Sequence, residues 1–279
     1  MALRALWDVA APAKLNLFLH LTGRRPDGYH LIQSAMVLID WHDTLHFECR
    51  DDGALARRDL GAALPADDLC LRAARLLQRE SATRYGADIS IDKRVPWGAG
   101  LGGGSSDAAS TLLALNRLWG LQWPLERLLD LGQRLGADLP FFLAGKNAWV
   151  EGIGERITPA QHEPRSFAVV KPAESLETRS VFENAGPIPE GRAVILAGFI
   201  EAGFGRNDLQ RAAQGLCPAV ARVGQWLQGQ FGNSRMTGSG SAVFATAIDA
   251  VQTLPALEAG WVGRICRSLE QHPLHGWAG

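Results

Sequence analysis

An excess of charge of either sign is missing from this chain of 279 residues. It carries 28 basic and 29 acidic residues, which gives a formal net charge of -1 at pH 7. Nucleic acids and anionic membranes attract proteins through a strong positive field, and this balance does not supply one. We therefore expect small molecules as partners, with no nucleic acid and no membrane among them.

Cysteine is scarce, and its four copies are scattered. Cys49, Cys70, Cys217 and Cys266 each lie in or beside an apolar segment, and no C-x-x-C pair occurs. This spacing indicates neither a zinc site nor a disulfide framework. The cysteines are expected to be small core residues of a protein in a reducing compartment.

Long apolar runs are also missing. No stretch approaches the ~20 apolar residues that a membrane-spanning helix requires, and Arg4 and Asp8 interrupt the apolar residues at the N-terminus. We therefore expect a cytoplasmic protein. Because 47% of the residues are hydrophobic, the chain can bury two moderate cores, and we expect two domains.

Glycine, in contrast, is concentrated in one stretch, VPWGAGLGGGSSDAA at residues 95–109, where five of the seven residues from 98 to 104 are glycine. Before it, residues 89–92 alternate as in a half-buried strand, and after it residues 108–119 repeat apolar side chains at helical spacing. Ser105 or Ser106 is expected to cap that helix. Glycines between a strand and a helix N-terminus favour an anion site, most plausibly for phosphate.

Three common phosphate-binding classes do not fit this stretch. A dinucleotide fold requires a second strand ending in an acidic residue, but residues 124–131 begin another helix. The P-loop requires a Lys before Ser105, and the protein-kinase motifs His-Arg-Asp and Asp-Phe-Gly are absent from the sequence. The alternative of a merely flexible loop remains open.

Two polar positions outside the glycine stretch are candidates for chemistry. Lys14 and Asn16 are two residues apart on a predicted strand, close enough for both to contact one ligand, although a solvated strand face is an equal alternative. Asp138 stands two residues before Pro140. It is either an ordinary turn or helix-start residue, or a carboxylate that accepts a proton or steers a cation.

The composition changes near residues 158–164, and we place a domain boundary there, with an N-terminal domain at 1–158 and a C-terminal domain at 159–279. The second half alternates predicted strands with predicted helices, which favours an α+β fold of ferredoxin-like type. The strands are expected at 167–170, 194–196, 242–245 and 262–266, and the helices at 179–184, 208–214, 220–228 and 250–257. A second glycine-rich piece, TGSGS at residues 237–241, precedes a strand; it is either a tight turn or a further source of backbone N–H groups.

Taken together, three motifs resemble the small-molecule kinases of the galactokinase, homoserine kinase, mevalonate kinase and phosphomevalonate kinase superfamily. They are PAKLN at residues 12–16, the glycine-rich stretch, and TGSGS at 237–241. RPDGYH at 25–30 and LGADLP at 135–140 are similar to the branch that acts on a cytidine diphosphate polyol in the non-mevalonate route to isoprenoid precursors. The resemblance covers nearly the whole chain.

The resemblance implies an α+β, two-domain small-molecule kinase fold, with an N-terminal ATP domain like domain 2 of ribosomal protein S5 and a ferredoxin-like C-terminal domain. It implies ATP and Mg²⁺ as cofactors. Catalysis is expected from Lys14 and Asp138, with the acceptor near Asn16 and no metal-ligating side chain assigned. The oligomeric state is expected to be a monomer or a weak homodimer.

Binding residues are implied in the same way. The ATP phosphates are expected at Pro96, Trp97, Gly98, Ala99, Gly100, Leu101, Gly102, Gly103, Gly104, Ser105 and Ser106, supported by Thr237, Gly238, Ser239, Gly240 and Ser241. Cytosine is expected at Tyr29, His30 and Phe182, within a substrate site that includes Thr178. Phe182 also fits the core of a helix. Asp68 stands where the family commonly has Asn beside the adenine, so its contact there is in doubt.

Two other functions stay open on the sequence. One is a superfamily kinase for homoserine or a mevalonate-type alcohol. The other is a phosphate-binding or nucleotide-binding module without turnover, because glycine loops bind phosphate without catalysing its transfer.

Overall fold

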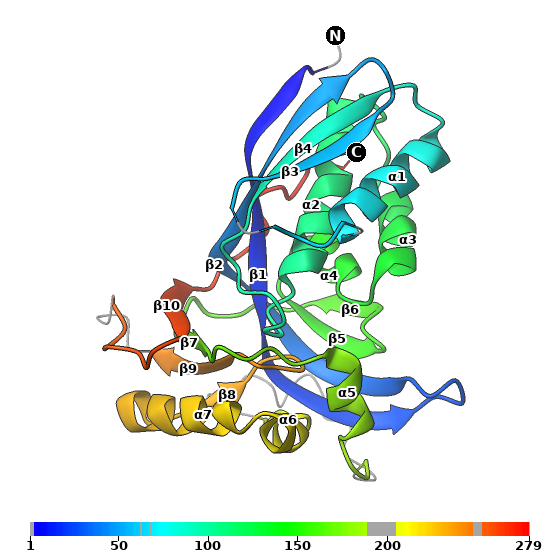
Figure 1. Cartoon of the computed structure of the whole chain (residues 1–279). Helices are drawn as coiled ribbons and strands as arrows, with labels where there is room; N and C mark the ends of the chain where they lie inside the picture. Colours follow the sequence, from blue (N-terminus) through cyan, green and yellow to red (C-terminus); the bar gives the residue numbers. More distant parts are fainter. Residues whose placement is uncertain (1–2, 62, 67, 189–204, 248–252, 279) are drawn as a thin grey trace.

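The structure is a computed structural model that describes residues 3–61, 63–66, 68–188, 205–247 and 253–278 (Figure 1). Its strands form a six-stranded sheet and a four-stranded sheet. Helices pack against both sheets, so the expected α+β class is confirmed. Within the described ranges, every helix is too short or too polar to cross a lipid bilayer.

The first sheet is built on a long antiparallel hairpin. Its strands are β1 (Ala5–Arg24), β2 (His30–Arg50), β3 (Leu55–Asp59), β4 (Gly86–Asp92), β5 (Ala148–Gly152) and β6 (Arg156–Pro159). β2 pairs with β1, β4 and β5, while β3 runs parallel to β4 and β6 pairs with β5. The apolar segments at residues 31–41 and 45–49 therefore belong to one strand.

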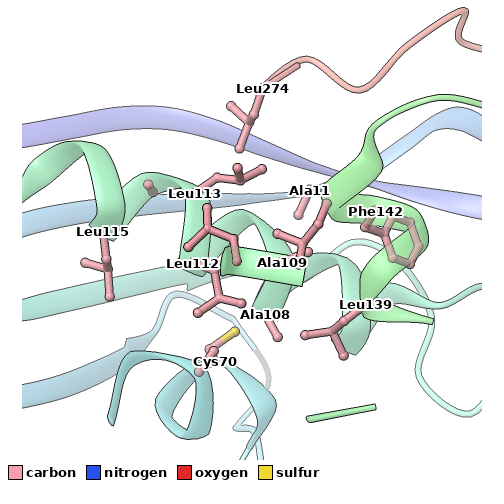
Figure 2. Close-up of a cluster of buried hydrophobic side chains, with 14 of the residues drawn as sticks. Ala11, Cys70, Ala108, Ala109, Leu112, Leu113, Leu115, Leu139, Phe142 and Leu274 are labelled. Carbon is pink, nitrogen blue, oxygen red and sulfur yellow. The ribbon is translucent and has the colours of Figure 1, made fainter. Parts of the chain in front are cut away.

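Four helices cover one face of this sheet (Figure 1). They are α1 (Leu69–Ser81), α2 (Gly103–Leu118), α3 (Leu125–Leu135) and α4 (Leu139–Ala144). α2 is buried on nearly all sides, because its residues are small or apolar all round. Figure 2 shows Leu112 and Leu113 of α2 among Ala11 of β1, Cys70 of α1 and Phe142 of α4.

The second sheet consists of β7 (Ser166–Lys171), β8 (Arg235–Met236), β9 (Val243–Ala247) and β10 (Val262–Arg267), all antiparallel in the order β10-β7-β9-β8. Helices α5 (Thr178–Glu183), α6 (Gln210–Leu216) and α7 (Pro218–Phe231) accompany it. Leu19, Leu21 and Ile32 of the long hairpin belong to the core of this sheet. The hairpin therefore contributes to both cores.

After β10 the chain returns to the first core. The backbone N–H of His272 donates to the carbonyl of Gly145 at the end of α4, at 2.8 Å. Leu274 is buried in the cluster around α2 (Figure 2). Residues far apart in sequence thus complete one core.

Two predictions of helix structure are corrected. No helix occurs in residues 253–257, the described part of the helix expected at 250–257, because Pro255 lacks the N–H that a helix interior requires. Neither Ser105 nor Ser106 caps α2, which begins one residue after Gly102, a glycine with φ of 72° and no capping side chain. The strand expected at 194–196 lies outside the described residues.

A test of the first core compares two leucines. Leu112 is fully buried, so Leu112→Ala is expected to lower the free energy of unfolding by about 2–5 kcal/mol, as other large-to-small core changes do. Leu216 is 44% exposed, so Leu216→Ala is expected to change it by less than about 0.5 kcal/mol. Urea unfolding monitored by circular dichroism measures both, and equal losses would contradict the central place of α2 in the core.

Candidate active site

The two glycine-rich loops lie against each other. The carbonyl of Gly98 accepts from Ser241 N–H at 3.2 Å, and the carbonyl of Ala99 accepts from Ala242 N–H at 3.0 Å. A Cβ atom on Gly100 would lie 2.3 Å from the carbonyl oxygen of Thr237. Glycine is required at this contact, because any side chain would push the loops apart.

A cavity of about 580 Å³ opens beside these loops. Its wall includes the first turn of α2, where backbone N–H groups without intrahelical partners and the positive end of the helix dipole favour an anion. Residues 96–105 all line the cavity, together with Gly238 and Ser239 of the second loop. Ser106, Thr237, Gly240 and Ser241 are not among the lining residues and support the loops from behind.

Lys14 and Asp138 meet in this cavity. The Lys14 side chain is 4% exposed, and its ammonium Nζ lies 3.5 Å from Oδ2 of Asp138. The same Nζ donates to Oδ1 of Asn16 at 2.5 Å and to the Gly100 carbonyl at 3.0 Å. Asp138 precedes α4 but makes no capping hydrogen bond with its side chain. Asp138 is thus both the helix-start residue and the carboxylate that faces Lys14.

The strand that carries Lys14 is buried on both faces, although on the sequence a solvated strand face was an equal alternative. Irregular register between Pro12 and Lys14, and again between Asn16 and Phe18, interrupts the alternation of β1 against β2. The second glycine-rich loop covers what would otherwise be an open face, because Thr237 Oγ1 accepts from the Asn16 N–H at 2.8 Å. The alternative of a solvated face is therefore wrong.

Asn16 holds Lys14 in place. Its Oδ1 accepts from the Lys14 ammonium, and its Nδ2 donates to Ser34 Oγ at 2.7 Å. The Ser34 hydroxyl in turn donates to the carbonyl of Phe18 at 2.6 Å. Because Lys14 Nζ, both polar atoms of the Asn16 side chain and Ser34 Oγ all have hydrogen-bond partners, the position of the ammonium is defined before a ligand binds.

The other end of the cavity is lined by Ile32, Thr178 and Phe182. The Phe182 ring lies 5.4 Å from the His30 ring, centroid to centroid. Burial and the nearby Arg24 lower the pKa of His30, so the imidazole is neutral at pH 7. Neither His30 nor Tyr29 is among the lining residues, and Tyr29 is 63% exposed. Of the three residues expected at the cytosine, Phe182 alone lines the cavity.

A buried ion network, which the sequence analysis does not identify, fixes the entry to the first glycine loop. The Lys93 ammonium contacts the carboxylates of Asp43 and Asp107, the latter at 2.7 Å. Asp43 Oδ1 also accepts from the N–H groups of Arg94 and Val95, at 2.6 and 2.7 Å. Asp107 lies within the conspicuous glycine stretch, but its partners are distant in sequence and no local pattern identifies them.

A second supporting residue, Asn207, is equally absent from the sequence analysis. Its Nδ2 donates to the carbonyls of Met236 and Gly238, each at 2.8 Å. These bonds hold the second glycine loop from the side opposite the cavity. A single Asn in front of a predicted helix gives no signal of this role.

Asp68 lines the cavity, but both of its carboxylate oxygens are engaged with the protein. Oδ1 accepts from the Leu71 N–H at 3.0 Å and caps α1, as expected for a helix start at this position. Oδ2 pairs with Arg57 at 2.9 Å. Asp68 therefore has a structural function at the cavity wall.

Resident metal sites built from side chains are not found here. Across the parts of the chain that the structure describes, no three His, Cys, Asp or Glu side chains are grouped so that they could hold a metal ion. Among the charged groups that line the cavity, Asp68 pairs with Arg57 and Asp107 with Lys93. Lys14 and Asp138, together with the backbone N–H groups, form a set suited to transfer of an anionic group.

Comparison with known proteins agrees with this chemistry. Residues 68–146 match the family model described as the GHMP kinases N terminal domain. The chain also resembles the crystal structure of a homoserine kinase from Cytophaga hutchinsonii, with a TM-score of 0.67 at 15% identity over 96% of this chain and 95% of that one. Fold and site therefore define a small-molecule kinase of the GHMP class.

More similar relatives narrow the class. A 4-diphosphocytidyl-2-C-methyl-D-erythritol kinase of Methylibium petroleiphilum is 61% identical over the full length of both chains. The enzyme of that name from Albidiferax ferrireducens is 54% identical over 99% of this chain and 96% of the relative. A crystal structure of 4-(cytidine 5'-diphospho)-2C-methyl-D-erythritol kinase has a TM-score of 0.76 at 30% identity, covering 92% of this chain and 98% of the other. The chain belongs to the 4-diphosphocytidyl-2-C-methyl-D-erythritol kinase family, which confirms the resemblance identified from its motifs.

The contact between the glycine loops is tested by Gly100→Ala. Gly100 has φ of 73°, and its Cβ would meet Thr237, so the free energy of unfolding is expected to fall by at least about 1 kcal/mol, the cost of a non-glycine residue in the left-handed region. Gly229→Ala in α7, which meets no atom within 4 Å, is the control and should leave stability unchanged or slightly higher. Thermal unfolding measures both, and a neutral Gly100→Ala would contradict the close loop contact.

Proposed function

We propose that this chain transfers the γ-phosphoryl group of ATP to the 2-hydroxyl group of 4-diphosphocytidyl-2-C-methyl-D-erythritol, a step of the non-mevalonate route to isoprenoid precursors. The observation that carries the proposal is the pairing of Lys14 and Asp138, 3.5 Å apart, in a cavity whose wall includes the N-terminus of α2. The names of the full-length relatives supply the substrate.

The phosphate tail of ATP is assigned to the glycine-rich stretch at residues 96–106. The N–H groups at the start of α2 face anionic oxygens there, and the residues from Gly102 to Ser105 all line the cavity. The loop at 237–241 supports this region through its contacts with Asn16, Gly98 and Ala99.

Mg²⁺ fits this site as a partner of the nucleotide. Magnesium usually keeps several waters and binds substrate phosphates with few protein ligands. Ser105 lines the cavity in the first turn of α2, and its hydroxyl would hold the ion. When bound, the ion neutralises charge on the phosphate oxygens.

Lys14 and Asp138 are assigned to the reacting groups. The ammonium has three donors, of which Asn16 and Gly100 occupy two. The third is available to the acceptor hydroxyl and the transferring phosphoryl group. Asp138 accepts the hydroxyl proton; because a carboxylate is a weak base toward an alcohol, the proton moves late, and Asp138 acts largely by orienting the hydroxyl.

The cytosine is assigned to the opposite end of the cavity. Phe182 and His30 provide aromatic surfaces for a flat base, and the neutral imidazole of His30 offers both a donor and an acceptor to its edge. Tyr29 precedes His30 at the hairpin turn, and its exposed ring is the third aromatic group assigned to the base. Thr178, whose hydroxyl lies 2.9 Å from that of Ser239, joins this end to the second glycine loop.

The finer description of the fold and setting is part of the same proposal. A ferredoxin-like C-terminal domain is supported by the order β10-β7-β9-β8, in which the fourth, first, third and second of the described strands lie side by side. A boundary near residues 158 and 159 is supported by β6 and β7, which belong to different sheets; β6 itself extends to Pro159, so the change of sheet falls within residues 160–165. An N-terminal domain like domain 2 of ribosomal protein S5 is part of the proposal, and the match to the GHMP kinases N terminal domain supports it. We propose a cytoplasmic monomer or weak homodimer; the free cysteines support a reducing compartment.

The catalytic pair is tested by substitution. Lys14→Ala and Asp138→Asn are each expected to lower kcat by about 10²–10⁴-fold, the usual contribution of positioned proton-transfer groups. Asp130→Asn, an exposed carboxylate on α3, is the control and should retain parental turnover. Steady-state ADP release measures all three, and turnover within about threefold of the parent in folded Lys14 and Asp138 variants would refute the assignment.

The cytosine site is tested by inhibition. CMP and CDP are expected to compete with the polyol substrate while UMP does not, because the base edges differ in their donors and acceptors. Phe182→Ala should raise KM for the polyol and leave KM for ATP unchanged. Equal inhibition by CMP and UMP would remove the cytidine assignment.

The acceptor itself separates the alternatives. ADP release is measured with the cytidylyl polyol, homoserine and mevalonate in parallel, and only the first is expected to support turnover. Preference for homoserine or mevalonate would indicate another superfamily kinase. Binding of ATP without turnover on any alcohol would indicate a nucleotide-binding module.

A further inference from the structure

One buried guanidinium uses all of its donors outside the catalytic centre. Arg57 of β3 has a side chain that is 7% exposed. Arginine carries five N–H donors in a rigid planar fork, and Arg57 finds an acceptor for each. Nε and Nη2 donate to the two oxygens of Asp59 at 2.8 and 3.2 Å, Nη2 also to the Leu64 carbonyl at 3.2 Å, and Nη1 to the Pro65 carbonyl and Asp68 Oδ2, both at 2.9 Å.

These acceptors belong to the wall of the cavity. Leu64, Pro65, Asp68 and Leu69 all line it, on the side where Val95 leads into the first glycine loop. Arg57 is not a lining residue. It therefore touches the backbone and the carboxylate of the wall from behind, where no ligand reaches it.

Besides the apolar packing of Leu64 and Leu69 against the first core, further hydrogen bonds attach the wall. Asp59, itself oriented by Arg57, accepts from the Leu64 N–H at 2.9 Å. Asp68 joins the wall to α1 by capping Leu71. The guanidinium of Arg57 thus contacts the end of β3, the segment at residues 64–65 and the start of α1 at the same time.

We propose that Arg57 is a positioning residue that shapes the compartment for the nucleoside end of ATP. The inference rests on the proposed function, which places the phosphates at α2 and the cytidine at His30 and Phe182. The apolar wall at Leu64, Pro65 and Leu69 then faces the purine nucleoside. Both carboxylate oxygens of Asp68 are occupied by contacts within the protein, to the Leu71 N–H and to Arg57. This wall therefore recognises the nucleoside by shape and backbone groups, and Arg57 maintains that shape.

Lysine cannot replace this group. Its ammonium has three donors on a flexible stem and cannot form the two-pronged contact with Asp59 while also reaching two carbonyls and Asp68. In Arg57→Lys the wall is expected to occupy its binding geometry in about a tenth of the molecules, which raises the apparent Kd for the nucleotide about tenfold.

The test measures the Kd for ADP by calorimetry, the two KM values and kcat, in the wild type and in Arg57→Lys. A rise of about tenfold in the Kd for ADP and in the KM for ATP is expected in Arg57→Lys, with KM for the polyol and kcat at saturating ATP unchanged. Arg50→Lys is the matched control, because Arg50 also pairs with two carboxylates, Asp52 and Asp88, but lies outside the cavity. It should change none of these constants.

Two results would overturn the inference while leaving the proposed function intact. One is an unchanged Kd for ADP in folded Arg57→Lys, even if its thermal stability falls. The other is a parallel rise in both KM values, which indicates general loosening of the site. A wild-type protein that neither binds ADP nor turns over the polyol would instead overturn the proposed function, and this inference with it.

Discussion

The buried ammonium of Lys14 is the group on which the rest of the site depends. A charge removed from water is costly unless it is paired and hydrogen-bonded. Here an amide oxygen, a backbone carbonyl and a carboxylate surround it, and each comes from a different part of the chain. The strand, the glycine loop and α4 must therefore all be in place before the ammonium is stable where it stands.

The long hairpin of β1 and β2 makes this assembly possible. It carries Lys14 and Asn16 in its middle, contributes to the first core through Val9 and Ala11, and reaches the second core with Leu19 and Leu21. Because one continuous element belongs to both cores, it fixes the position of the phosphate loop on one side relative to Phe182 on the other. The cavity between them is defined by packing on both sides.

Sequence patterns were sufficient for most of the local structure. The strand before the glycine loop, α2 and α3 follow from the periodicity of the apolar residues, which acts over a few residues. The pairing of Lys14 with Asp138 also follows from the family resemblance, and the structure brings the two side chains together. That pairing has no local signal, since the residues lie on different elements.

What could not be predicted depends on contacts between distant segments. The network of Lys93 with Asp43 and Asp107 joins three separate segments of the chain, and the sequence around each residue gives no indication of its partners. The burial of both faces of β1 depends on a loop more than two hundred residues later in the chain. Helix capping at α2 was mispredicted because serine usually leads at such positions, whereas the backbone here requires the left-handed conformation of Gly102.

The return of the chain after β10 has a consequence for how the protein is made. Domains generally fold as units while a polypeptide is being synthesised, the N-terminal one first. In this chain Leu274 fills part of the core around α2, and His272 bonds the end of the helix that Asp138 precedes. The half that holds the reacting groups therefore reaches its final packing only when residues 272–274 have left the ribosome, so a nascent chain cannot present a finished catalytic centre until the second sheet has been synthesised as well.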